Sequence, residues 1–224
     1  MIRIVALLAL LLTWTCQMHT GEADEPTEPD TAKAQIDNLV KLPDGWRWDR
    51  PVCEHAKRVG DAIQLRTEAG RIWAGVGSQN RIITKEPVGD LAMVFAEIEL
   101  VDAVNKWEQC GLLVYQHDDS FVKLVVEHID GTHFVVMAIE AEDKRKVLAK
   151  IEIPDSHAQL SLQVNDSKVT GVWRSNSSQP WKNAAETQLR REKTRHFAVF
   201  SQDGDPANPR YALARGLRQT RHGP

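Results

Sequence analysis

Short runs in which apolar and polar residues alternate recur along most of the chain after residue 60, and this pattern indicates β-strands. Turn-forming pairs such as Asp118-Asp119, Asp130-Gly131 and Pro154-Asp155 separate the runs. A spacing of about 8–14 residues between turns is typical of an antiparallel sandwich or barrel. A helix fits only at 183–195, where the polar composition favours a loop. The strand runs span 63–67, 71–75, 81–85, 91–101, 110–116, 121–128, 133–140, 146–153, 160–164, 168–174 and 196–201.

The alternation also assigns faces to the two strands around Asp118-Asp119. In the run 121–128, the side chains of Val122, Leu124 and Val126 share one face, which we expect to face the core. A hairpin through Asp118-Asp119 would place the opposite faces of both strands side by side. That shared surface carries polar and aromatic side chains: Gln109, Tyr115, Phe121, Lys123 and Glu127.

The first residues have the pattern of an export signal. Arg3 precedes an apolar run over residues 4–12, which is shorter than the ~20 residues that span a bilayer. We therefore predict a signal peptide over 1–23 rather than a transmembrane segment, and a secreted, periplasmic or cell-envelope protein. A lipid anchor at Cys16 is the alternative. The rest divides into an acidic disordered linker (24–38), a β-sandwich (39–213) and a basic flexible tail (214–224).

Charge and motifs exclude several functions. The net charge of −3 gives no basic footprint for nucleic acid. No phosphate loop, dinucleotide fingerprint or Cys/His cluster is present, so we expect neither cofactor nor metal. Removal of the signal would leave Cys53 and Cys110, which could form a disulfide in an oxidising compartment or lie apart as small buried side chains.

Residues 107–127, WEQCGLLVYQHDDSFVKLVVE, resemble the central hairpin of the DUF1349 family and of the C-terminal sandwich appended to family 43 β-xylosidases. Phe121 stands where the family pattern has Trp, and Val125 stands where it has Gly or another small residue. The acid of an earlier family element is replaced by Arg71, and a later acidic element is missing at 140–145. The resemblance implies a concanavalin A-like jelly roll, a two-sheet antiparallel β-sandwich with one concave face, associated with carbohydrate-active enzymes.

From these patterns we expect a non-catalytic, lectin-like module that binds a glycan on the concave face. Aromatic rings stack on the apolar faces of sugars, while charged and amide groups fix the hydroxyls. The candidate ligand-binding residues are Tyr115, Phe121, Lys123 and Glu127, with Trp73 and Trp181 at the rim. The competing interpretation of Lys123 and Glu127 is a surface ion pair, and that of Trp181 is a lid packed over a sheet end.

Two other functions stay open. Glu97 and Glu99 alternate on one strand face, as the carboxylates of a glycoside hydrolase would, but we favour the interpretation of an amphipathic edge strand with solvated charges. The other is a structural or protein-partner module of the cell envelope. On the binding hypothesis, Lys123→Ala should abolish binding and leave the melting temperature nearly unchanged.

Overall fold

The chain folds into two antiparallel seven-stranded sheets in a computed structural model that describes residues 40–70, 72, 79–141, 144–191 and 193–221. The first sheet has the order β1 (Trp46–Asp49), β4 (Arg81–Thr84), β13 (His196–Gln202), β6 (Gln109–His117), β7 (Ser120–Ile129), β8 (Thr132–Ala141) and β9 (Lys144–Ile153). The second has the order β12 (Lys182–Gln188), β11 (Lys168–Arg174), β10 (His157–Asn165), β5 (Leu91–Val101), β14 (Tyr211–Arg221), β3 (Ala62–Arg66) and β2 (Ala56–Val59). A short 3₁₀ turn, Cys53–His55, precedes β2.

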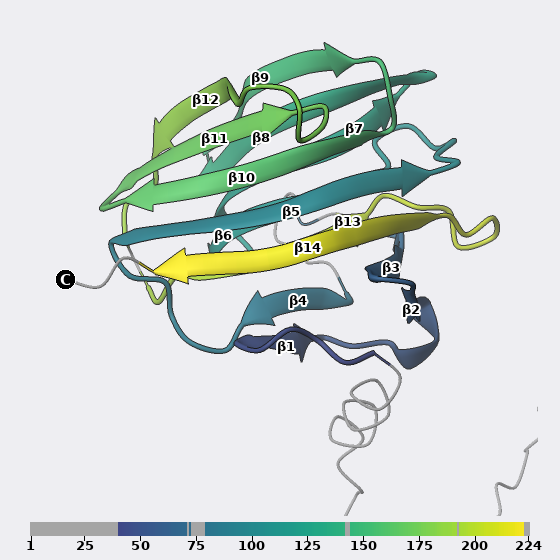
Figure 1. Cartoon of the computed structure of the whole chain (residues 1–224), viewed down its shortest axis with the longest axis horizontal. Helices are drawn as coiled ribbons and strands as arrows, with labels where there is room; N and C mark the ends of the chain where they lie inside the picture. Colours follow the sequence, from purple (N-terminus) through teal and green to yellow (C-terminus); the bar gives the residue numbers. More distant parts are fainter. Residues whose placement is uncertain (1–39, 71, 73–78, 142–143, 192, 222–224) are drawn as a thin grey trace, which may run out of the picture.

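The sheets stack face to face as two layers, with the second sheet in front of the first in Figure 1. Strands β5 and β10 of the second sheet pack over β6 and β7 of the first. The inward side chains alternate as the sequence predicted, since Val122, Leu124 and Val126 are fully buried in the main core. Trp173 of β11 belongs to the same core. The predicted all-β sandwich is therefore confirmed.

A second hydrophobic cluster lies on the outer face of the first sheet. It contains Leu113 of β6 and Phe121 and Val125 of β7, and Ile72 from the segment between β3 and β4 packs on it. Ile72 is fixed there by a hydrogen bond from its backbone N–H to the side-chain oxygen of Gln202, at 2.6 Å. Ile72 consequently covers part of this outer face.

The strands that sequence patterns missed lie mostly at sheet edges. Strands β1, β2 and β12 each end a sheet, so one side of each ladder and many of their side chains face solvent. The residues 182–188 form β12 rather than the predicted loop, because β11 supplies a partner strand from Lys168 to Trp173, with one register shift between Gly171 and Val172. The run predicted at 71–75 lies outside the described residues apart from residue 72.

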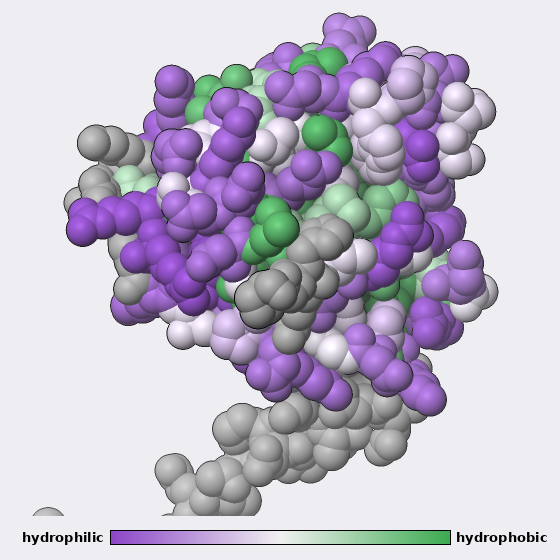
Figure 2. All heavy atoms as spheres, turned by 60° about the vertical axis from the view of Figure 1, so that its left-hand side comes forward, coloured by the Kyte–Doolittle hydropathy of each residue, from purple (hydrophilic) through white to green (hydrophobic). Residues whose placement is uncertain are grey.

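The predicted flexible tail is wrong for residues 214–221, which belong to β14 between β5 and β3. A register shift between Arg215 and Arg218 interrupts the alternation, and Gly216 adopts a φ of 59° there. Because of this bulge, apolar and polar residues do not alternate along the whole strand, so the sequence pattern did not predict it. Figure 2 shows one side of the molecular surface. Hydrophilic residues predominate on this side, and its hydrophobic residues form small separate patches.

The predicted signal and linker, residues 1–38, lie outside the described residues. Within the described part of the chain, no helix is long and apolar enough to cross a membrane.

Candidate functional site

A pocket of about 260 Å³ opens on the first sheet's outer face, beside the second hydrophobic cluster. Strands β6 to β9 form its floor and one wall, and the segments that follow β5 and β13 close the other side. Its polar lining consists of Gln109, Lys123, Glu127, Lys150, Gln202 and Asp203, and its apolar lining of Trp107, Ile129, Val136, Ala138 and Val147.

The β6–β7 hairpin places the central polar groups. Gln109 lies directly opposite Glu127, and Leu113 lies opposite Lys123. Because residues two apart on a strand share a face, Lys123 and Glu127 both point away from the main core. The shared surface predicted for this hairpin is confirmed by its register.

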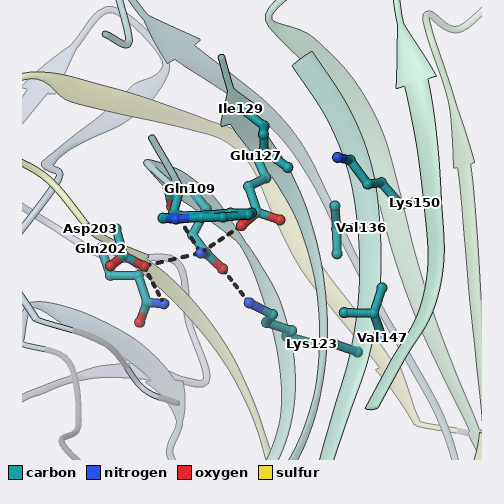
Figure 3. Close-up of a pocket in the computed structure, with 11 residues that line it drawn as sticks. Gln109, Lys123, Glu127, Ile129, Val136, Val147, Lys150, Gln202 and Asp203 are labelled. Atoms are coloured by element: carbon teal, nitrogen blue, oxygen red, sulfur yellow. Dashed lines mark hydrogen bonds between the residues drawn. The ribbon is translucent and has the colours of Figure 1, made fainter. Parts of the chain in front are cut away.

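The amide of Gln109 connects the charged groups of the pocket floor (Figure 3). Its oxygen accepts a hydrogen bond of 2.7 Å from the Lys123 ammonium. Its nitrogen donates to Glu127 Oε1 at 3.3 Å, to Asp203 Oδ2 at 3.2 Å and to the Trp107 carbonyl at 3.0 Å. An amide nitrogen carries two hydrogens, so the three acceptors share two donors. Glu127 has the longest of these three hydrogen bonds, and its carboxylate therefore keeps acceptor capacity for a ligand hydroxyl.

Burial changes the titration of both charged residues on β7. It lowers the pKa of Lys123, and the charges of Glu127, Asp203 and Glu140 oppose this shift. Burial also raises the pKa of Glu127, which the Lys123 ammonium partly offsets. Both side chains are only 6% exposed. The expectation that Lys123→Ala leaves stability unchanged therefore does not fit the structure, because this ammonium is buried among carboxylates.

Trp107 and the wall strands supply the apolar part of the pocket. Trp107 is 39% exposed and has a φ of 76°, a conformation that a bulky residue rarely adopts. A hydrogen bond of 2.9 Å from its backbone N–H to the His128 carbonyl holds it in place. On β9, Val147 is 56% exposed, and the Lys150 ammonium lies 4.1 Å from the centre of the Phe134 ring.

Tyr115 and Phe121 share the same sheet face but do not line the pocket. Phe121 is fully buried in the outer cluster, and Tyr115 is 9% exposed. The buried Arg81 guanidinium stacks 4.4 Å from the centre of the Tyr115 ring and pairs with Asp49 and Asp118. The Tyr115 hydroxyl in turn donates to Asp118 at 2.9 Å. These contacts make Tyr115 part of an internal network, leaving Lys123 and Glu127 as the predicted residues that line the pocket.

Of the two predicted rim tryptophans, Trp181 does not join this pocket. Trp73 lies outside the described residues. Trp181 lies on the outer face of the other sheet, where its ring meets Phe95 edge to face at a centroid distance of 5.9 Å. The placement at the rim was wrong because residue 181 leads into β12, which pairs with β11 of the second sheet.

The carboxylates of Glu97 and Glu99 also lie on the outer face of the second sheet. Strand β5 is internal rather than the expected edge strand, but its alternation is as predicted, with Val94, Ala96 and Ile98 buried. Arg215 of the neighbouring β14 pairs with Glu99 at 2.8 Å and with Glu97 at 3.8 Å. Both carboxylates thus form cross-strand ion pairs with Arg215.

Among the residues that the structure describes, no group of three or more His, Cys, Asp or Glu side chains could hold a metal ion. Cys53 and Cys110 are both described, and no disulfide joins them. Cys110 is fully buried in the main core.

Sequence patterns missed Trp107, Lys150 and Asp203 as pocket residues. Trp107 precedes β6, and Asp203 follows β13 with a φ of 62°, so neither belongs to the alternation of a strand. Lys150 follows a register shift opposite Met137 and Ala138, which changes the face that β9 presents. The sequence signal that could have identified Trp107 was its position as the first residue of the 107–127 stretch.

The fold matches the sandwich parts of larger carbohydrate-active enzymes. The GH43 protein BlXynB from Bacillus licheniformis gives a TM-score of 0.70 at 15% identity, over 81% of this chain and 38% of that one. A xylan beta-1,4-xylosidase from Bacillus halodurans gives 0.69 at 14% identity, over 83% and 38%. A functionally unknown protein from Saccharomyces cerevisiae gives 0.59 at 11% identity, over 80% and 96%.

This chain therefore spans about two fifths of the length of the GH43 structures that it matches. At these identities the likeness concerns the fold. No family model matches the sequence. No curated protein matches it either.

Proposed function

We propose that this chain is an exported, non-catalytic carbohydrate-binding module of the DUF1349 kind, which holds a neutral glycan in the pocket beside Trp107. The observation that carries the proposal is the half-exposed Trp107 ring above a floor of connected amide, ammonium and carboxylate groups. A sugar needs both features, an apolar surface for its C–H face and fixed polar groups for its hydroxyls.

The charges of the lining favour a neutral ligand. Two ammonium groups, from Lys123 and Lys150, face two carboxylates, from Glu127 and Asp203, so the lining has no net charge. Gln109 fixes Lys123, Glu127 and Asp203 relative to one another. A prearranged set of this kind loses little conformational freedom when a ligand binds.

Two further observations support the proposal. The matched GH43 structures include an enzyme that acts on xylan, which makes β-linked xylo-oligosaccharides the first probe. The apolar run at residues 4–12 has the length of an export signal, which would carry the chain to extracellular polysaccharides.

The test is a glycan array of neutral oligosaccharides, followed by calorimetry on any that bind. Trp107→Ala should weaken binding at least about tenfold, since burying a large apolar side chain contributes about 1.5–3 kcal/mol. Trp181→Ala is the matched control, because it removes an equally exposed tryptophan from the opposite face. Lys150→Ala should also weaken binding, whereas Lys146→Ala on the same strand should not. Equal loss with both tryptophan variants, or a blank array with folded protein, contradicts the proposal.

A glycoside hydrolase on the same face is the second candidate, and one observation favours it. Glu127 and Asp203 accept from a single nitrogen at 3.3 and 3.2 Å, so these oxygens lie no further apart than about 6.5 Å. Burial raises the pKa of Glu127, as a general acid requires. The same glycans should then be cleaved, and Glu127→Gln should abolish cleavage while retaining binding. Intact glycans after incubation with wild-type protein exclude this reaction for the substrates tested.

A further inference from the structure

The outer face of the second sheet carries a groove that the proposed function does not use. Its lining includes Phe95 of β5, Ser161 and Gln163 of β10, Arg174 of β11, Trp181 and Arg218 of β14, and we term it the arginine–tryptophan groove. Its volume is about 250 Å³, and a second hollow of about 370 Å³ continues it through Phe95, Arg174 and Arg218.

The pairing of β10, β5 and β14 determines the positions of the central residues of the groove. Phe95 lies directly opposite Ser161 on one neighbouring strand and opposite Arg218 on the other. These three side chains form one row across β10, β5 and β14, on the face away from the core. Trp181 packs edge to face against Phe95 and closes one end. The groove is therefore built from the regular part of the sheet.

Both arginines are oriented by aromatic rings. The Arg218 guanidinium lies 4.0 Å from the centre of the Phe95 ring, and that of Arg174 lies 4.5 Å from the centre of the Trp181 ring. Arg174 also donates from Nε to the Gln159 side chain at 2.7 Å, and from Nη1 to the Ser177 and Gln179 carbonyls at 3.2 and 3.4 Å. Stacking leaves the edge of a guanidinium available for a planar anion, and at Arg174 the donor that these contacts leave is Nη2.

Neither Arg174 nor Arg218 pairs with a carboxylate among the residues that the structure describes. The other arginine on this face, Arg215, is by contrast neutralised by Glu97 and Glu99. The arginine–tryptophan groove itself is lined by two arginines and by no acidic residue. Its electrostatic potential favours an anionic ligand.

A buried hydroxyl provides an independent indication of a ligand. Ser161 lines the groove and is 2% exposed, and its Oγ has no hydrogen-bond partner in the described structure. Buried polar atoms are nearly always hydrogen-bonded, because leaving one without a partner is costly. Ser161 Oγ and the exposed Gln163 amide are thus placed to bond hydroxyl groups of a ligand in the groove.

We propose that the arginine–tryptophan groove binds an acidic oligosaccharide, with a uronate carboxylate held by Arg174 and Arg218. The hydroxyls of that sugar bond Ser161 and Gln163, and its ring lies against Trp181, which is 40% exposed. The adjoining hollow is lined by Asp61 and Glu97 as well as by Arg215, so it accommodates the next sugar of the chain through its hydroxyls rather than through its carboxylate. This site lies on the opposite sheet from the pocket beside Trp107 and does not depend on the function proposed there.

The experiment is calorimetry at low ionic strength on purified protein with oligomers of galacturonate, mannuronate and glucuronate. Methyl-esterified oligogalacturonate is the matched ligand control, since esterification removes only the charge. Binding of at least one acid, with loss on esterification and weakening by added salt, is the expected result. No binding of any of the three, or equal binding of the ester, overturns the proposal. Equal binding of poly-glutamate would identify an acidic peptide instead and would also overturn it.

Variants then locate the site. Arg218→Ala should weaken binding by about ten- to a hundredfold, as expected for a charge-assisted hydrogen-bond pair, and Arg218→Lys should restore only part of it. Arg191→Ala, an exposed arginine outside the groove, and Trp107→Ala should leave affinity unchanged. Ser161→Ala should weaken binding without lowering the melting temperature, because it removes a hydroxyl that lacks a partner. Unchanged affinity in Arg218→Ala or Ser161→Ala refutes this placement of the ligand.

Discussion

Replacement of Lys123 by methionine tests whether the charges of the pocket floor act as one buried network. Methionine keeps the length of the side chain and removes the ammonium. Lys123 is 6% exposed and donates at 2.7 Å to Gln109, and three carboxylates, those of Glu127, Asp203 and Glu140, act on its charge. Removing one member of a buried pair costs about 3–5 kcal/mol, because the remaining charge is left uncompensated. We therefore expect Lys123→Met to lower the free energy of unfolding by that amount at pH 7.

Urea unfolding followed by tryptophan fluorescence measures this loss. With a slope of about 2–3 kcal/mol per molar urea, the midpoint should fall by about 1–2.5 M. The double variant Lys123→Met/Glu127→Gln should recover part of the loss, since it removes the opposing charge as well. The loss should also shrink at pH 4, because burial raises the pKa of Glu127 and this carboxylate then takes up a proton. Lys146→Met on β9 is the control, and as an exposed substitution it should change stability by less than about 0.5 kcal/mol.

A loss below about 1 kcal/mol in Lys123→Met, with no recovery in the double variant, would refute the reasoning. It would mean that the ammonium is solvated in solution and that Gln109 does not hold a buried network.

Three more predictions concern other parts of the fold. Gly111→Ala should lower the free energy of unfolding by about 1–3 kcal/mol or more, because the added Cβ would lie 2.6 Å from the Val125 Cα on the paired strand. Gly89→Ala is the control, since its Cβ would have no atom within 4 Å, and it should be nearly neutral in the same urea denaturation assay. Since burial raises the pKa of Glu127 above its unfolded value of about 4.3, its contribution to stability is complete below that pH and is lost as the pH rises through the folded pKa. Glu127→Gln should remove this pH dependence in denaturation curves from pH 4 to 8, and an identical slope in both proteins would contradict the assignment. Burial also raises the pKa of the Cys110 thiol, so iodoacetamide should modify it only after unfolding, and modification of native protein detected by mass spectrometry would disprove its burial.

The sequence by itself determined the fold class and the geometry of the central hairpin. Alternation at 121–128 is a local property of the chain, so it identified the inward residues and the shared face of Gln109, Lys123 and Glu127 without any knowledge of the partner sheet. The internal strands β6 and β7 carry this signal strongly because both neighbours and the opposite layer require it, whereas the bulge in the internal strand β14 interrupts it.

Only the tertiary structure decided which aromatic residues are available to a ligand. Tyr115 and Phe121 share the face of Lys123, but Ile72 and Arg81 from distant segments cover them. Trp107 and Trp181 lie outside strands, so no alternation predicts where they point, and strand order alone places them on opposite faces of the sandwich. The physical reason is that alternation assigns a side chain to a face of its own strand, whereas its exposure depends on segments that pack there from elsewhere in the chain.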